Sequence, residues 1–134
     1  MINKQVHSLS ESVSDIHDGS TIMISGFGEA GSPIELIHAL IDHGARNLTV
    51  ISNNTGSGHV GLAALIEMKR VQKMICSFPR TANSTVFPEL YKSGDIELEL
   101  VPQGTLAERI RAGGAGIPAF YTATSIHTPL SEGK

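Results

Sequence analysis

The sequence predicts an α/β fold in which an open, mainly parallel sheet carries helices on both of its faces. Four short apolar runs recur along the chain, and each segment between them is long enough for the crossover helix that parallel strands require. With 134 residues, the chain can bury a real core but is too short for two domains. Residues 1–134 are therefore interpreted as a single domain.

The first half of the chain alternates between helix and strand signals. Apolar residues at helical spacing predict a helix at 8–17, and the apolar run at 21–25 is typical of a buried strand. A second helix is expected to begin after Ser32, a good capping residue, and to end at Gly44. The next apolar run, at 48–52, predicts the second strand.

The second half continues the same alternation. Helices are expected at 60–68 and 84–91, and strands at 71–76 and 96–101. The last of these strands alternates acidic and apolar residues, which indicates one wetter face and a position near a sheet edge.

A final helix is predicted to start with the turn at Gly104-Thr105 and to end in the small residues 113–116, with Pro118 at its exit. Three glycines stand close together there. Such spacing is found where the backbone must bend sharply or approach something closely.

Composition excludes several function classes. A net charge of −3 and an aromatic content of 4% leave no basic surface or stacking platform for nucleic acid. The single cysteine, Cys76, rules out a disulfide framework and is expected to be an inert core thiol. The six histidines lack metal-binding spacing, so no metal is expected. No apolar run approaches the ~18 residues of a membrane helix, and residues 1–20 lack a signal-peptide pattern, so a cytoplasmic protein without a membrane contact is expected.

Residues 26–31 read G-x-G-x-x-G directly after a predicted strand, which invites a dinucleotide-binding interpretation. That interpretation needs an acidic residue at the end of the second strand, where this chain has Ser52, Asn53 and Asn54. The expected helix also starts too late for the motif. A tight strand-to-helix turn is the plainer alternative, and a nucleotide-dependent oxidoreductase is disfavoured.

Three loops follow predicted strands, and they begin near Gly26, Asn53 and Pro102. In parallel sheets ligands bind outside the carboxyl ends of the strands, so these loops are expected to gather at one edge. Gln103 is neutral and cannot act as nucleophile or base, but its amide can donate to a developing oxyanion. Ordinary turns and a helix cap remain alternative interpretations of the asparagine loop and of Gln103.

The run from Pro102 to Thr122, together with Asp18-Gly19 and the segment from Gly26 to Pro33, resembles the A subunit of the two-subunit (family I) CoA-transferases. These are enzymes of the 3-oxoadipate and succinyl-CoA:3-oxoacid types. The resemblance extends over residues 18–122. One departure is Ser25, which stands where the family usually has a glycine.

The resemblance implies both the activity and the site. Gln103 would stabilise the oxygen of the thioester carbonyl under attack. Other residues would bind substrate or CoA: Gly26, Phe27, Gly28, Gly31, Asn53, Asn54, Gly113, Gly114 and Gly116. CoA would enter as a thioester substrate, and no further cofactor is implied.

The family's nucleophile is a glutamate that becomes a glutamyl-CoA thioester, and it belongs to a Ser-Glu-Asn-Gly segment of the B subunit. This chain has no such segment. The resemblance therefore implies a B-subunit partner, a hetero- or homo-oligomer, and a chain that is inactive alone. A catalytically inactive binding or interaction domain is the rival interpretation.

Two further features bear on this interpretation. The family's A subunits continue beyond the length of this chain, so the C-terminal part of the family fold is expected to be missing, and 124–128 lack the glycines of the family's turn there. The segments at 52–56 and 76–80 look closest to the 3-oxoadipate enzymes, whereas 102–121 looks equally like the succinyl-CoA:3-oxoacid enzymes. The acyl acceptor stays open between 3-oxoadipate and acetoacetate.

Overall fold

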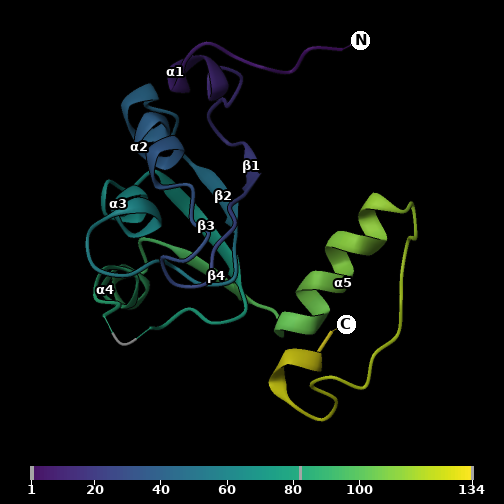
Figure 1. Ribbon diagram of the computed structural model, residues 1–134. Coiled ribbons are helices and arrows are strands. Elements are labelled where there is room, and N and C mark those ends of the chain that lie inside the picture. The colour runs from purple at the N-terminus through teal and green to yellow at the C-terminus, as the bar shows by residue number, and fades with distance from the viewer. Residues whose placement is uncertain (1, 82, 134) are drawn as a thin grey trace.

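The computed structural model describes residues 2–81 and 83–133, and within them four parallel strands form one open sheet (Figure 1). The strands are β1 (Thr21–Met23), β2 (Leu48–Ile51), β3 (Val71–Cys76) and β4 (Glu97–Leu100), which lie side by side in sequence order. Every neighbouring pair is parallel. The predicted α/β class and parallel sheet are confirmed, and β4 lies at a sheet edge as its alternation indicates.

Helices lie on both sides of this sheet (Figure 1). The crossover helices α2 (Ile34–His43), α3 (Gly61–Glu67) and α4 (Val86–Ser93) pack against one another in that order on one face. The longest helix, α5 (Gln103–Gly114), follows β4 and stands on the other side. A 3-10 turn, η1 (Pro129–Ser131), comes near the end of the chain. Within the described residues, none of these helices has both the length and the apolar character that a membrane crossing needs.

The two faces of the sheet differ because alternate residues of each strand point to opposite sides. Ile22, Val50, Met74 and Leu98 lie in register across the four strands and belong to the core that α2, α3 and α4 cover. Their neighbours form the opposite face, where Met23 is 62% exposed. The apolar core is therefore one-sided, and the second face is only partly covered.

A carboxylate on that second face holds α5 in place. Glu99 of β4 accepts from Arg109 of α5 at 3.0 Å and pairs with Lys73 of β3 at 3.2 Å. Its side chain is 29% exposed, so this three-residue cluster is partly shielded from water. The cluster ties α5 to the edge of the sheet, and the start of α5 then faces the carboxyl ends of β1 and β2.

The first predicted helix, at 8–17, is much shorter in the structure. The helix α1 covers only Leu9–Ser12, capped by Ser8, whose hydroxyl accepts from the N–H of Glu11. Two further serine hydroxyls donate to backbone carbonyls within this segment, Ser12 to Ser8 and Ser14 to Glu11. Such local bonds compete with helix continuation, which explains why apolar spacing alone overestimated the helix.

The structure corrects the predicted start of one helix and shows how another helix ends. The helix α2 begins at Ile34 with Pro33 at its cap and no side-chain cap bond, so the expected capping role of Ser32 was wrong. At the far end of α5, Gly113 and Gly114 are still helical. Ile117 then donates to Ala112 and Gly116 donates to Gly113, a pair of bonds that closes the helix with Gly116 in the left-handed region.

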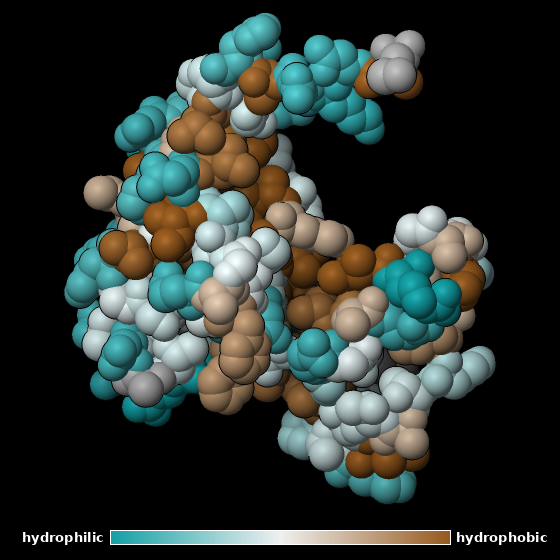
Figure 2. Space-filling view, in the orientation of Figure 1, coloured by the Kyte–Doolittle hydropathy of each residue, from teal (hydrophilic) through white to brown (hydrophobic). Residues whose placement is uncertain are grey.

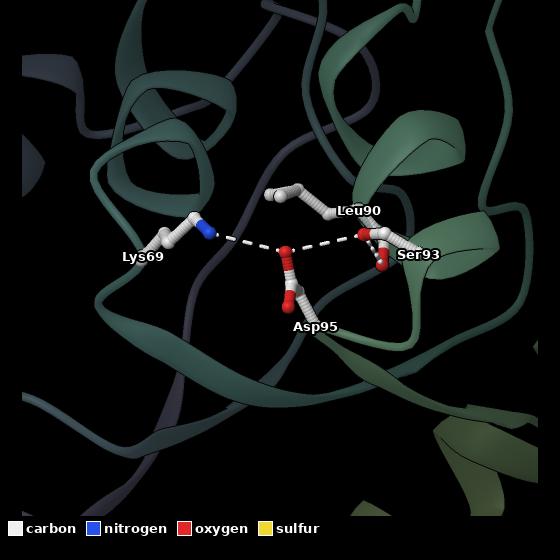
Figure 3. Close-up of polar contacts among 4 residues, drawn as sticks. All are labelled: Lys69, Leu90, Ser93 and Asp95. Atoms are coloured by element: carbon white, nitrogen blue, oxygen red, sulfur yellow. Dashed lines mark hydrogen bonds and ion pairs between the residues drawn. The ribbon is translucent and has the colours of Figure 1, made fainter.

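At the amino ends of the strands, an ion pair joins two loops (Figure 3). Lys69, just before β3, donates to Asp95, just before β4, at 3.0 Å. Ser93 of α4 donates to the same carboxylate at 3.1 Å. These bonds, with the Lys69 hydrogen bond as the largest cause, lower the pKa of Asp95 below its usual value.

One glycine in the β2–α3 connection has no room for a side chain. Gly56 has a φ of +78°, and a Cβ placed on it would lie 2.5 Å from the backbone nitrogen of Ala63 in α3. Gly19 has nearly the same φ, +79°, but open space around it. We expect Gly19→Ala to cost about 1–2 kcal/mol of unfolding free energy through backbone strain alone.

Gly56→Ala is expected to cost about 1–3 kcal/mol more than Gly19→Ala, because α3 must shift as well. Denaturant unfolding of the two variants and the unsubstituted chain measures both effects. Equal losses for the two variants would contradict the close approach of this loop to α3.

The lowered pKa of Asp95 makes the stability of the fold depend on pH. Because the folded pKa of Asp95 lies below its usual value of 3.8, its contribution to stability is present above about pH 3.8 and is lost as pH falls through the lower folded pKa. Asp95→Asn should lower the thermal midpoint slightly at pH 7, less at high salt, and progressively less as the pH falls below about 3.8.

Thermal unfolding between pH 7 and pH 3 at two ionic strengths tests this. The control is Glu97→Gln, since Glu97 starts the same strand but makes no ion pair among the described residues. A loss at Asp95 that neither salt nor acid reduces would show that the carboxylate does not act through its charge.

Candidate functional site

A groove of about 360 Å³ lies where β1, β2 and α5 meet at the carboxyl edge of the sheet. Its walls come from the ends of β1 and β2, from the loops that follow them, and from the first two turns of α5. Figure 2 shows hydrophobic residues gathered where the sheet and its covering helices approach the part of the molecule formed by α5 and the residues after it. A hollow lies between these two parts. The lining residues are Met23, Ile24, Ser25, Gly26, Ile51, Ser52, Asn53, Gln103, Leu106, Ala107 and Ile110.

The structure thus brings together three residues that the sequence singled out on separate loops: Gly26, Asn53 and Gln103. The expected convergence of strand-end loops at one edge of the sheet therefore occurs. The functional roles assigned to these residues stay predictions.

The loop that begins at Gly26 is a compact hairpin rather than a helix start. Phe27 and Ala30 exchange backbone hydrogen bonds of 2.9 and 3.2 Å, and the hydroxyl of Ser25 donates to the carbonyl of Gly31 at 2.8 Å. Gly26 has a φ of +136°, and a Cβ there would lie 3.3 Å from Ser32. The helix α2 begins only at Ile34, so the G-x-G-x-x-G segment does not open a helix as a dinucleotide site requires.

Other members of the same motif lie outside the groove. Phe27 sits at the hairpin and is 79% exposed. Gly28 and Gly31 have φ values of +60° and +73°, which suits the tight turn. Their predicted contact with substrate would therefore need a ligand that extends beyond the groove.

Asn53 is held at the end of β2 by the residues that follow β3. Its carbonyl oxygen accepts from the backbone N–H groups of Phe78 at 2.9 Å and Ser77 at 3.3 Å. Its side-chain Oδ1 accepts from the hydroxyl of Ser77 at 2.8 Å. Asn53 is half-buried and lines the groove, and the bond from Ser77 holds its side chain.

Asn54 is 4% exposed and turns away into its own loop, where its Oδ1 accepts from the N–H of Gly56 at 2.8 Å. The loop is joined to the segment after β3 by further bonds. Thr55 donates to Pro79 at 2.7 Å, and the hydroxyls of Ser57 and Thr81 lie 2.9 Å apart. Asn54 therefore shapes the loop, and the structure separates it from the groove that Asn53 lines.

Gln103 is the first residue of α5 and is exposed at the mouth of the groove. Its cap residue is Pro102, and the helix has no side-chain cap bond, so the alternative role of Gln103 as a helix cap has no support. Its side chain makes no hydrogen bond to any described residue. At the amino end of a helix the backbone dipole favours negative charge, which suits an amide that donates to an oxyanion.

The glycines at the other end of α5 do not reach this groove. Gly113 lines a separate cavity of about 580 Å³ between α5 and residues 117–131. Gly114 and Gly116 belong to the helix end described above. The predicted contact of these three glycines with CoA stays a prediction.

Within the described part of the chain, none of the residues that line the groove has a titratable side chain. Nearby, Cys76 ends β3, and burial raises the pKa of its thiol to about 11, partly opposed by a hydrogen bond from the backbone of Phe78. Within residues 2–81 and 83–133, no group of three His, Cys, Asp or Glu side chains is placed to hold a metal ion. The groove can donate and accept hydrogen bonds, but it offers no carboxylate or thiolate to attack a substrate.

Reasoning from the sequence missed the apolar residues that line the groove and two serines that hold its loops, Ser25 and Ser77. Ser77 was treated only as part of a subfamily segment, and Ser25 only as a departure from a family pattern. Both act through hydrogen bonds that join loops, Ser77 across 24 residues to Asn53 and Ser25 across six to Gly31. Only their position in the sequence could have indicated these residues, since both stand at or just after the carboxyl end of a predicted strand.

Comparison with known sequences places these features in a family. The sequence profile of the coenzyme A transferase family matches residues 6–134. The chain is 59% identical to the A subunit of 3-oxoadipate CoA-transferase from Pseudomonas putida, over all of this chain and 58% of that protein. It is 49% identical to the A subunit of a probable succinyl-CoA:3-ketoacid coenzyme A transferase from Bacillus subtilis, over 99% of this chain and 55% of the relative. The chain thus spans somewhat more than half the length of these relatives.

Solved structures show the same fold. An acyl-CoA transferase from Escherichia coli O157:H7, solved as a thioester complex with CoA, matches 85% of this chain and 23% of its own at 27% identity, with a TM-score of 0.70. Glutaconate coenzyme A-transferase from Acidaminococcus fermentans matches 92% of this chain and 40% of its own, with a TM-score of 0.78. At 19% identity, the second likeness concerns the fold alone.

The family profile spans nearly the whole chain, and the four-stranded parallel sheet with its helices has the fold of solved CoA-transferases. This chain therefore belongs to the coenzyme A transferase family.

Proposed function

We propose that this chain is an A-type subunit of a CoA-transferase, which moves CoA from an acyl-CoA donor such as succinyl-CoA to a 3-oxoacid. The acceptor is 3-oxoadipate or acetoacetate, and the reaction takes place in the cytoplasm. The name of the relative from P. putida supports 3-oxoadipate, and that of the relative from B. subtilis supports a 3-ketoacid more broadly. The single, buried cysteine fits a reducing compartment.

The groove itself carries this proposal. Every transfer of an acyl group from a thioester passes through a tetrahedral state in which the carbonyl oxygen becomes negatively charged. The amide of Gln103 stands at the groove with its N–H groups unengaged by described residues, at the positive end of α5. Such a donor gains strength as charge develops, so it acts on the transition state more than on the bound substrate.

The groove supplies no nucleophile, and this determines the role of the partner. In the proposed reaction a glutamate carboxylate of a B subunit attacks the thioester carbonyl and displaces the CoA thiolate, which leaves a mixed anhydride. The thiolate then attacks the glutamyl carbonyl of that anhydride, which forms the glutamyl thioester and releases the donor as a free carboxylate. The acceptor carboxylate runs the same exchange in reverse, so that the new acyl-CoA forms and the glutamate is freed. Because no described side chain that lines the groove is ionisable, these covalent steps need that partner residue. The A-type chain would bind the acyl part and stabilise the oxyanion.

The direct test mixes purified chain with succinyl-CoA and either 3-oxoadipate or acetoacetate, with and without the B subunit of a related two-subunit enzyme. We expect no new acyl-CoA from the chain alone, and turnover when the B subunit is added. Size-exclusion chromatography with light scattering establishes whether the complex has formed.

Each outcome decides between interpretations. Turnover by the chain alone, or a borohydride-trappable glutamyl thioester on it, would overturn the proposed division of roles. A stable complex without turnover would favour the rival interpretation of a catalytically inactive binding domain. A soluble monomer that ignores the B subunit would contradict the partnership.

Substitution of Gln103 tests its proposed role as oxyanion donor. In the active complex, Gln103→Ala should lower kcat by about 10²–10³ and change KM little, because an oxyanion donor acts mainly in the transition state. Gln103→Glu should be worse, since it places negative charge where negative charge develops.

Gln72→Ala is a matched control, because Gln72 is exposed on β3 and does not line the groove. Steady-state kinetics of the three variants give the comparison. A kcat for Gln103→Ala within about twofold of the unsubstituted complex, less than ~0.5 kcal/mol of barrier, would remove the catalytic role.

A further inference from the structure

We infer that Ser77 is a positioning residue, which fixes the side-chain amide of Asn53 so that its N–H₂ group faces the groove and donates to an acyl oxygen. This inference rests on the proposed function, because it names the group of the same site that meets a carboxylate or carbonyl oxygen. Ser77 does not line the groove and acts only through Asn53.

The other hydrogen bonds of Asn53 determine which oxygen of Asn53 accepts from the hydroxyl of Ser77. The hydroxyl of Ser77 lies 3.1 Å from the carbonyl oxygen of Asn53 and 2.8 Å from its Oδ1. That carbonyl already accepts from two backbone N–H groups, those of Phe78 and Ser77. A carbonyl oxygen has two lone pairs, so the hydroxyl hydrogen is left for Oδ1, which is also the shorter contact.

This assignment fixes the orientation of the amide. If the amide of Asn53 were flipped, its N–H₂ would face the hydroxyl of Ser77, and the hydroxyl hydrogen would have to compete for a carbonyl that is already satisfied. With Oδ1 engaged by Ser77, the N–H₂ end is directed away from Ser77. Asn53 lines the groove, so this end is the one available to a ligand there.

The groove then presents amide donors from two directions, Asn53 at the end of β2 and Gln103 at the start of α5. Among the residues that the structure describes, no cationic side chain lines it, so an anion would be held by hydrogen bonds and the helix dipole rather than by an ion pair. Such a pair of neutral donors suits an acyl oxygen, because a bound substrate must also be released after it reacts.

The kinetic test uses the complex with the B subunit. Ser77→Ala should raise KM for the acyl substrate about three- to tenfold, the range expected for one neutral hydrogen bond, with a smaller change in kcat. Ser77→Thr keeps the hydroxyl and should restore KM to within about twofold. The control is Ser57→Ala, which removes a comparable loop-to-loop bond, that to Thr81, without touching Asn53.

A double substitution separates positioning from general loop stability. If Ser77 acts through Asn53, adding Ser77→Ala to an Asn53→Ala variant should have no further effect on KM. An undiminished effect in that background would overturn the inference. So would equal effects of Ser77→Ala and Ser57→Ala.

A binding measurement on the chain alone does not depend on turnover. Succinate, added to ¹⁵N-labelled chain, should shift the side-chain N–H₂ signals of Asn53, and this shift should be lost in Ser77→Ala but kept in Ser57→Ala. If turnover with the B subunit fails while the Asn53 shift is seen, the proposed function falls but the assignment of the amide stands. If Asn53 does not respond to succinate in the unsubstituted chain, the inference is overturned.

Discussion

Parallel pairing of four consecutive strands is the constraint on which the rest of this structure depends. Because the strands run in one direction, their carboxyl ends meet at a single edge, and the loops that leave them must converge there. Residues far apart along the chain, Gly26 and Gln103 among them, thereby come to line one groove. The same direction requires crossover helices, and these bury one face of the sheet.

The division of the sheet into two unlike faces explains how the groove is built. The buried face uses apolar residues in register and gives a rigid platform. The other face bears Glu99, which is paired with Lys73 and Arg109 and so brings α5 across the sheet. The helix is positioned by a partly shielded charge cluster and by the chain connection at Pro102, while apolar side chains such as Leu106 fill the space beneath it.

The strands and most of the helices could be predicted from the sequence. The features that could not be predicted depend on contacts that leave no local pattern. Apolar runs located all four strands, because burial on one or both faces leaves a local pattern. The helix at 8–17 was overestimated because serine hydroxyls bond the backbone there, which periodicity does not register. Asn53 and Asn54 are adjacent and chemically identical, yet one lines the groove and the other closes a turn. Consecutive residues at a strand end point to opposite sides, and the bond from Ser77 to Asn53 joins residues 24 positions apart, which no local pattern reveals.

The buried thiol of Cys76 has a consequence for the chemistry proposed at this edge of the sheet. Thioester exchange needs a thiolate, and a group whose pKa is about 11 is protonated in neutral solution. Although the thiol belongs to the strand next to the one that leads into the groove, it would neither capture an acyl group from a thioester nor attack the disulfide of oxidised CoA. In the proposed reaction, the sulfur of the CoA substrate would thus meet no competing thiolate from Cys76.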